Sequence, residues 1–208
     1  MNVIYKTESW LMYILSCILF FNKKFMTDYA TTIGSTVYLP EDAKEWSQER
    51  IDSILVHEYI HVLDYKKEKL LFVLKYLFPQ ILFPLALLIL PFNWIVGLFL
   101  AIVFVLPLPA PWRTNYEIRG YTMTLIALSI LWKKQGKSEE WIFTNLNEII
   151  KIMDEKFFKS SAYYFMWPFG VENKLKQIVT DIKTGDIFIE DSVYSQSCDA
   201  VLGNYQQD

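Results

Sequence analysis

The chain contains the segment His57-Glu58-Tyr59-Ile60-His61, which uses both histidines of its 208 residues. Residues four apart lie on the same face of an α-helix, so His57 and His61 would direct their imidazole nitrogens at one point. A divalent metal ion could bind there, with Glu58 beside it as a base toward a bound water. The alternative is a pair of core histidines without a metal. The spacing favours the metal site.

A third metal ligand has to come from elsewhere in the chain. A catalytic zinc site usually has three protein ligands and leaves the fourth position to water. No third histidine exists and neither cysteine lies near the motif, so the missing ligand should be a carboxylate. We expect Glu117, because a lone acid on an apolar helix surface needs a partner. Gly120, one turn later, would allow this helix to approach the histidine helix closely. Alternatively, Glu117 pairs with Arg113 or Arg119.

Other residues are candidates for supporting roles. Asp64 follows the histidines at helical spacing and either orients a histidine through its far ring nitrogen or is a solvated acid at the helix end. A developing oxyanion would also need a hydrogen-bond donor besides the metal. With both histidines used as ligands, that donor must be Tyr, Arg, Asn or backbone. Arg119 and the pair Tyr163-Tyr164 are candidates, and the sequence does not choose between them.

The segment 76–111 contains no charged residue, and six prolines interrupt it. It therefore predicts a hairpin that turns at Pro91-Phe92-Asn93 rather than one long helix. Each leg is short for a bilayer crossing. Basic residues flank the segment on both sides, which predicts that both ends lie on the cytoplasmic side of a membrane. The alternative is a hairpin buried in a soluble oligomer or a particle. If Glu117 shares a metal with the histidines, the segment must fold back in either case.

The rest of the chain predicts a mainly α fold (α+β with a minimal sheet) in a single domain, residues 1–208. The clearest strand-like segment before the motif is Thr36–Leu39. We expect helices at about 44–65, 115–132, from 138 onward and at 172–183, with a buried or interfacial helix within 9–22. The apolar content of 53% is high for a small soluble domain. The net charge of −3 gives no reason to expect a nucleic-acid partner.

These residues resemble those of the gluzincin metallopeptidases, in which a His-Glu-x-x-His helix is completed by a glutamate on a later helix. Their order, with an apolar hairpin between the motif and Glu117, is similar to that of membrane-embedded gluzincins of the prenyl-protein and heat-shock membrane protease type. There the pattern is commonly Glu-x-x-Ala-Asp, whereas Gly120 and Tyr121 occupy the last two places here. The sequence at residues 31–34 and 38–40 also resembles that of small uncharacterised metallopeptidase-like proteins of bacteriophages.

The resemblance, which covers roughly residues 31–121, implies a zincin-like helix pair with an inserted hairpin. It implies Zn²⁺ as the cofactor and hydrolysis of a peptide or protein substrate at or near a membrane, with lipid contact through 76–111. Glu58 would be the general base. The strand at Thr36–Leu39 would lie along the cleft and could bind an extended peptide by strand addition. Two other classes stay open: a metal-stabilised structural or membrane-interaction protein, and a membrane protein without a metal.

Overall fold

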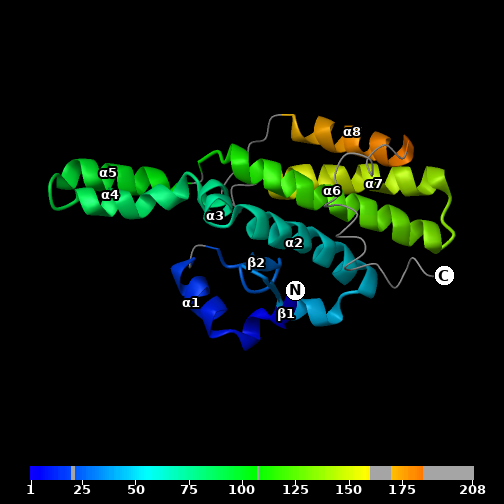
Figure 1. The fold of residues 1–208 in the computed structure, drawn as a ribbon, viewed down its shortest axis with the longest axis horizontal. Coiled ribbons are helices and arrows are strands. Elements are labelled where there is room, and N and C mark those ends of the chain that lie inside the picture. The colour runs from blue at the N-terminus through cyan, green and yellow to red at the C-terminus, as the bar shows by residue number, and fades with distance from the viewer. Residues whose placement is uncertain (20–21, 107, 160–169, 185–208) are drawn as a thin grey trace.

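The computed structural model describes residues 1–19, 22–106, 108–159 and 170–184. Within these residues the fold is mainly helical with one small sheet, which confirms the predicted fold class at that level (Figure 1). The strands are β1 (Asn2–Tyr5), β2 (Thr31–Ile33) and β3 (Thr36–Leu39). The α-helices are α1 (Trp10–Ile18), α2 (Gln48–Glu68), α3 (Leu70–Leu77), α4 (Phe83–Ile89), α5 (Trp94–Val105), α6 (Pro111–Lys134), α7 (Glu139–Met153) and α8 (Val171–Thr184). Short helical turns are η1 (Lys6–Glu8), η2 (Glu41–Glu45), η3 (Gln80–Leu82) and η4 (Asp154–Phe158).

The sheet has the strand order β1-β3-β2, with β1 parallel and β2 antiparallel to β3. The predicted strand Thr36–Leu39 is β3, and β1 was not predicted. Because β3 is hydrogen-bonded on both sides, its backbone cannot accept a further strand. The expectation that this strand binds a peptide by strand addition is therefore wrong. Of the described strands, β1 and β2 form the two edges.

Helix α2 carries the histidine motif, and local signals fix its ends. It begins at Gln48 rather than near Lys44, because the preceding acidic residues form η2 and the Ser47 side chain caps the helix by accepting from the Arg50 N–H at 3.3 Å. It ends at Glu68, where Lys69 has a φ of +49° and turns the chain into α3. This turn brings α3 back toward the histidines.

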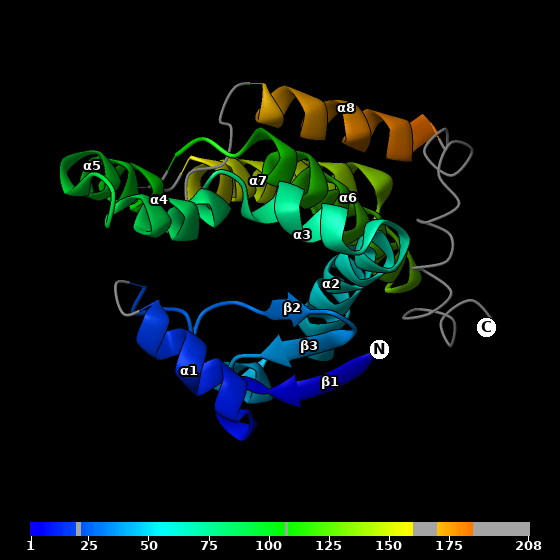
Figure 2. The same ribbon diagram turned by 60° about the vertical axis from the view of Figure 1, so that its left-hand side comes forward.

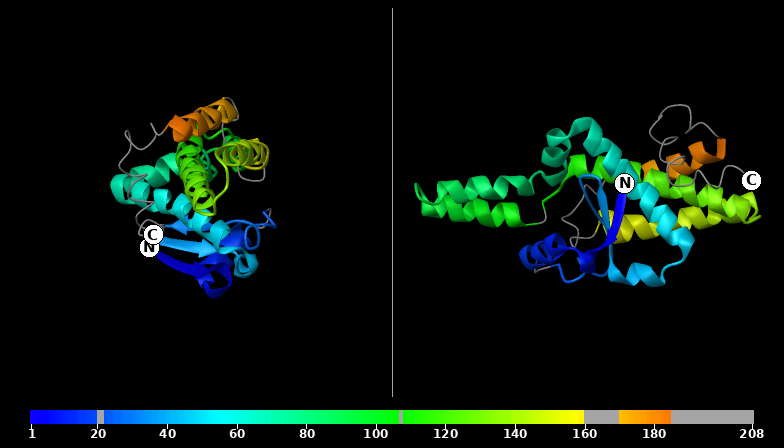
Figure 3. Two further views of the ribbon diagram at one scale, coloured as in Figure 1. Left: turned by 90° about the vertical axis from the view of Figure 1, so that its right-hand side faces the viewer. Right: turned by 60° about the horizontal axis from the view of Figure 1, so that its bottom comes forward.

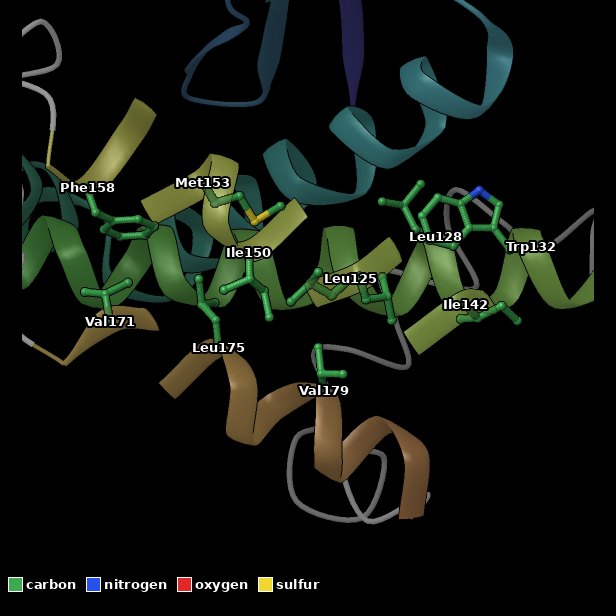
Figure 4. Close-up of a cluster of buried hydrophobic side chains, with 11 residues drawn as sticks. Leu125, Leu128, Trp132, Ile142, Ile150, Met153, Phe158, Val171, Leu175 and Val179 are labelled. Carbon is green, nitrogen blue, oxygen red and sulfur yellow. The ribbon is translucent and has the colours of Figure 1, made fainter. Parts of the chain in front are cut away.

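Helix α6 lies at the centre of the helical part and is buried on two sides. Val56 and Ile60 of α2 pack against Met123 and Ile126 of α6. A second cluster joins α6 to α7 and α8 (Figure 4), and its labelled members include Leu125, Ile150 and Leu175. The sheet and α1 lie on the far side of α2 from α6, α7 and α8 (Figures 1 and 2). Helix α2 is thus the element between the sheet and the helical core.

Helices α4 and α5 lie side by side and project away from the rest of the protein (Figures 1 and 3). The turn between them falls at the predicted Pro91-Phe92-Asn93, and the Asn93 side chain caps α5 by accepting from the Val96 N–H at 3.1 Å. Both legs are short, as expected: α4 has 7 residues and α5 has 12. The first leg breaks at Phe78-Pro79, which separates α3 from η3 and α4.

No single helix among the described residues is both long and apolar enough to cross a membrane. The consecutive segments Leu70–Leu77 and Gln80–Ile89 reach that length and composition together, but they meet at a bend of 98°. The contact of residues 76–111 with lipid stays a prediction, and contact with protein is its alternative. The tyrosines at 163–164, which were candidates for an oxyanion donor, lie outside the described residues.

Candidate metal centre

The two histidines of α2 point at the same place. His57 and His61 are 8% and 5% exposed, and their Nε2 atoms lie 3.2 Å apart. This is the geometry expected of residues four apart on one helix face. Both rings are held by aromatic neighbours, with the Tyr121 ring centroid 4.6 Å from that of His57 and the Tyr76 ring centroid 5.8 Å from that of His61. The imidazoles are therefore fixed in orientation by packing.

Glu117 of α6 completes the group from the opposite helix. Its Oε2 lies 3.3 Å from His57 Nε2, and its Oε1 lies 3.5 Å from His61 Nε2. Ligand atoms bonded to a metal at about 2.0–2.1 Å in a tetrahedral arrangement lie roughly 3.3–3.4 Å from one another. The observed separations match that spacing, and nitrogen and carboxylate oxygen are suitable donors. The buried group of His57, His61 and Glu117 could therefore hold a metal ion.

The alternative partners proposed for Glu117 are engaged elsewhere. The Nε of Arg113 donates to the Tyr76 carbonyl at 2.8 Å, and its Nη2 donates to the Gln80 side chain at 2.9 Å. Arg119 forms an ion pair with Asp64 at 2.7 Å. Glu117 instead accepts a hydrogen bond from the hydroxyl of Tyr76. The carboxylate thus faces the histidines with a neutral donor behind it.

Gly120 brings α6 onto His57, as its size predicted. A Cβ atom built on this residue would lie 2.7 Å from both Cε1 and Nε2 of the His57 ring. No side chain fits at that distance without displacing the imidazole. The absence of a side chain at this position therefore sets how closely α6 approaches α2, and so where Glu117 stands relative to the histidines.

The charges of the three residues are coupled. Burial raises the pKa of Glu117, but the charge of His61 and the hydrogen bond and charge of His57 outweigh it and lower the pKa to about 2. Burial lowers the pKa of His57, yet the hydrogen bond and charge of Glu117 raise it overall. For His61 burial prevails, and its pKa is lowered. Glu117 is thus ionised at neutral pH, which is the state that a metal ligand requires.

Glu58 lies beside this group but makes a separate contact. It is buried, and its Oε2 accepts a hydrogen bond of 2.6 Å from the Thr32 hydroxyl of β2. It is not part of the convergent ligand group found among the described residues. The carboxylate of Glu58, the residue next to His57, is therefore held by a hydrogen bond from the sheet.

Asp64 is buried, at 3% exposed, so the alternative that it is a solvated acid at the helix end is wrong. Its ion pair with Arg119 joins α2 to α6. Among the described residues, the Nδ1 of His61 has no hydrogen-bond partner, so Asp64 does not orient this histidine. Arg119, a candidate oxyanion donor, is the residue that Asp64 engages.

Two neighbours of the centre, Tyr76 and Lys6, were not predicted. Tyr76 was read as the first residue of the apolar segment, although a buried tyrosine hydroxyl usually has a hydrogen-bond partner, and that signal could have indicated its role. Burial and the charge of Glu117 raise its pKa, so the phenol stays a donor. Lys6, at 0% exposed, donates to the Phe25 carbonyl, and its Nζ lies 4.0 Å from the centroid of the Phe25 ring.

Lys6 gives a prediction for the pH dependence of stability. Burial lowers its pKa from 10.5 to about 7, and the charge of Glu58 opposes this in part. Between these two pH values the unfolded chain binds a proton that the folded protein has lost, so the free energy of unfolding rises with pH. At 1.36 kcal/mol per pKa unit, the rise over the whole range is roughly 4–5 kcal/mol, of which about 3–4 kcal/mol falls between pH 7 and pH 10. Lys6→Met should remove this rise in the free energy of unfolding. Urea unfolding at pH 7 and pH 10 measures it.

A matched control for this prediction is Lys137→Met. Lys137 also lies over an aromatic ring, with its Nζ 5.0 Å from the Trp141 centroid, but it is exposed. Its replacement should leave the difference in stability between pH 7 and pH 10 as in the unaltered protein. If Lys6→Met has that same unaltered difference, Lys6 is not desolvated in the folded state.

Comparisons of the chain with protein-family models, with curated proteins and with solved structures find no match.

Proposed function

We propose that the protein is a zinc-dependent metallopeptidase that hydrolyses peptide bonds at or near a membrane. The observation that carries this proposal is the convergence of His57, His61 and Glu117 at spacings of 3.2–3.5 Å, with Glu58 beside them and held by Thr32. Two imidazoles and one carboxylate are a donor set that suits zinc. In this proposal α2 and α6 form a zincin-like helix pair, and 76–111 is a hairpin inserted between them.

Different residues of the chain would have different roles in the hydrolysis. Zinc bound here would supply Lewis acidity, which polarises a peptide carbonyl and makes a water molecule more acidic. Glu58 would accept the proton of the attacking water and deliver it to the leaving amine. Tyr76 would hold Glu117 in place by its hydrogen bond. An extended substrate could pair with the open edge of β2, which adjoins Glu58 through Thr32.

A catalytic role is favoured over a structural metal site by the number of ligands. Structural zinc sites usually have four protein ligands, whereas catalytic sites have three and leave a position for water. In the described part of the chain, three residues converge. The second candidate, a metal-stabilised structural or membrane-interaction protein, predicts bound metal without any hydrolysis.

The membrane part of the proposal rests on residues 76–111, which carry no charge. Exposed lysines precede this segment, and by the positive-inside tendency they favour the cytoplasmic side for the metal centre. Burial of the hairpin in a particle or a soluble oligomer is the alternative, because protein and lipid select similar side chains.

The metal content of the purified protein tests the site. The unaltered protein should bind about one zinc ion, and Glu117→Ala should lose most of it because two histidines alone hold zinc weakly. Glu148→Ala, which removes an exposed acid paired with Lys151, should keep full occupancy. Mass spectrometry of metals measures both. Equal occupancy of Glu117→Ala and the unaltered protein would remove Glu117 from the site.

Peptide hydrolysis is measured on the same preparations. Chelation should abolish cleavage of an unfolded protein substrate, and added zinc should restore it. Bound zinc without cleavage would favour the structural candidate instead. Protein without any zinc would contradict both.

A further inference from the structure

Helix α3 is amphipathic, with one face against the metal centre and the other in solvent. Phe72 and Tyr76 face inward: the Phe72 ring centroid lies 4.7 Å from that of Tyr116, and the Tyr76 hydroxyl donates to Glu117. Four leucines occupy the opposite face at positions i, i+1, i+4 and i+7 and are 42–69% exposed: Leu70, Leu71, Leu74 and Leu77. A contiguous exposed leucine face is unusual on a soluble surface and marks an interaction site.

The projecting pair α4 and α5 continues this apolar surface. Its exposed side chains are almost all apolar, and the turn between the helices presents Phe92, which is 90% exposed, and Trp94, which is 68% exposed. Further exposed members are Leu85, Leu88, Ile95, Phe99 and Ile102. Because no charge occurs between Lys75 and Arg113, the surface from Leu77, at the end of α3, to the hairpin tip is both apolar and uncharged.

The length of the projection limits how deep it can reach. Helix α5 has 12 residues, about 18 Å at 1.5 Å per residue, and α4 is shorter. The hydrocarbon core of a bilayer is about 30 Å thick. The pair α4–α5 is therefore long enough to enter one leaflet but too short to cross two.

The bend between α3 and the first leg gives the orientation. The axes of Leu70–Leu77 and Gln80–Ile89 meet at 98°. When α4 stands along the membrane normal, α3 therefore lies nearly in the membrane plane. Helix α3 stands at the base of the projection, with α2 and α6 on one side and α4 and α5 on the other (Figures 1 and 3). Its inner face is held by α2 and α6, so the leucine face is turned away from them.

The charges around α3 select the type of membrane. Lys66, Lys67 and Lys69 directly precede α3 and are exposed. Exposed basic residues next to an apolar face complement anionic lipid headgroups. On the other flank, Arg113 is buried and bonded to the Tyr76 carbonyl, so it is not available to lipid. Lys75 within α3 is paired with Glu68 at 2.8 Å, so the available positive charge is concentrated at the start of α3.

We propose that α3, α4 and α5 form a monotopic membrane anchor. Helix α3 lies in the headgroup region of an anionic leaflet with its leucines inward, and α4 and α5 enter that leaflet and return. The metal centre then lies directly under the membrane surface, because Tyr76 on the inner face of α3 contacts Glu117. This inference extends the membrane contact in the proposed function, but it does not depend on zinc or on hydrolysis.

Flotation of the full chain with lipid vesicles tests the anchor. The protein should float with vesicles that contain phosphatidylglycerol and bind about tenfold less to pure phosphatidylcholine. Leu70→Glu and Leu74→Glu should each lower the bound fraction about tenfold. Both side chains are exposed, so neither change should disturb folding, which circular dichroism checks.

Ile152→Glu is the matched control, because Ile152 is 49% exposed on α7, and it should float like the unaltered protein. Flotation of the α3 variants equal to that of the control would overturn the proposal.

Thiol labelling distinguishes entry into one leaflet from a crossing. Phe92→Cys, in a chain with Cys17→Ser and Cys198→Ser, should resist a membrane-impermeant maleimide trapped inside vesicles to which the protein is added from outside. Labelling from within would show that the hairpin crosses the bilayer and would overturn the one-leaflet geometry. A stable oligomer that binds no vesicles would overturn the anchor itself. Glu58→Gln should float normally, so loss of flotation and loss of hydrolysis are separate results.

Discussion

Replacing Glu58 with glutamine is expected to abolish peptide hydrolysis while leaving the bound metal in place. The amide retains the size of the side chain and can still accept the hydrogen bond of the Thr32 hydroxyl. It cannot accept a proton from water at neutral pH. Loss of a general base typically lowers the rate by roughly 10²–10⁴-fold. Metal content should be unchanged, because Glu58 is outside the convergent ligand group of the described residues.

The measurement pairs a zinc determination with an initial rate of peptide cleavage on one preparation. Glu49→Gln provides the control, because it makes the same chemical change on the same helix. The Glu49 carboxylate accepts hydrogen bonds from the side chains of Trp132 and Gln135, and neither of these bonds involves a histidine. Its replacement should leave hydrolysis nearly unchanged. Full activity of Glu58→Gln would exclude the proposed mechanism, and loss of zinc together with activity would make Glu58 a ligand.

The part of the site that could be predicted from the sequence is the part set by helical spacing. His57 and His61 face one point because they are four apart on a helix. Glu117 and Gly120 were assigned from the cost of burying a lone acid and from the small size of glycine. Their positions relative to His57 agree with that reasoning, with Glu117 Oε2 at 3.3 Å and a Gly120 Cβ that would lie at 2.7 Å.

The parts that could not be predicted depend on contacts between distant segments. Tyr76 and Glu117 are separated in the sequence by the whole apolar hairpin, yet their side chains are hydrogen-bonded. Thr32 of the sheet is likewise hydrogen-bonded to Glu58 of α2. Lys6, directly after β1, is fully buried, although lysines are usually exposed. Strand β1 pairs with β3 across more than thirty residues of sequence. No local pattern encodes these pairings, because each depends on how already formed elements pack.

The flanking charges show the same limit in another form. Basic residues on both sides of 76–111 supported the prediction of two ends at one membrane surface. In the folded protein, Arg113 is buried at 6% exposed and Arg119 is paired with Asp64. Both arginines therefore serve the contact between α6 and its neighbours. The exposed lysines before α3 remain as the charge that a membrane could meet.

Replacing Gly120 with alanine is expected to lower metal affinity by about a hundredfold or more. In most helices this change stabilises the protein by about 1 kcal/mol, because glycine is a poor helix former. Here the added Cβ would lie 2.7 Å from the His57 ring, so the imidazole must move. Changes that disturb the surroundings of metal ligands cost 10–100-fold in affinity, and a displaced ligand should cost at least as much.

The experiment compares zinc affinity and metal-free stability of Gly120→Ala with those of Ser129→Ala, a change at a partly buried position of the same helix. The control should bind zinc like the unaltered protein, because the Ser129 hydroxyl bonds the Ile126 carbonyl of its own helix. Unchanged zinc affinity in Gly120→Ala would mean that α6 can withdraw from α2 without moving Glu117. The contact between these two helices would then not set the geometry of the metal centre.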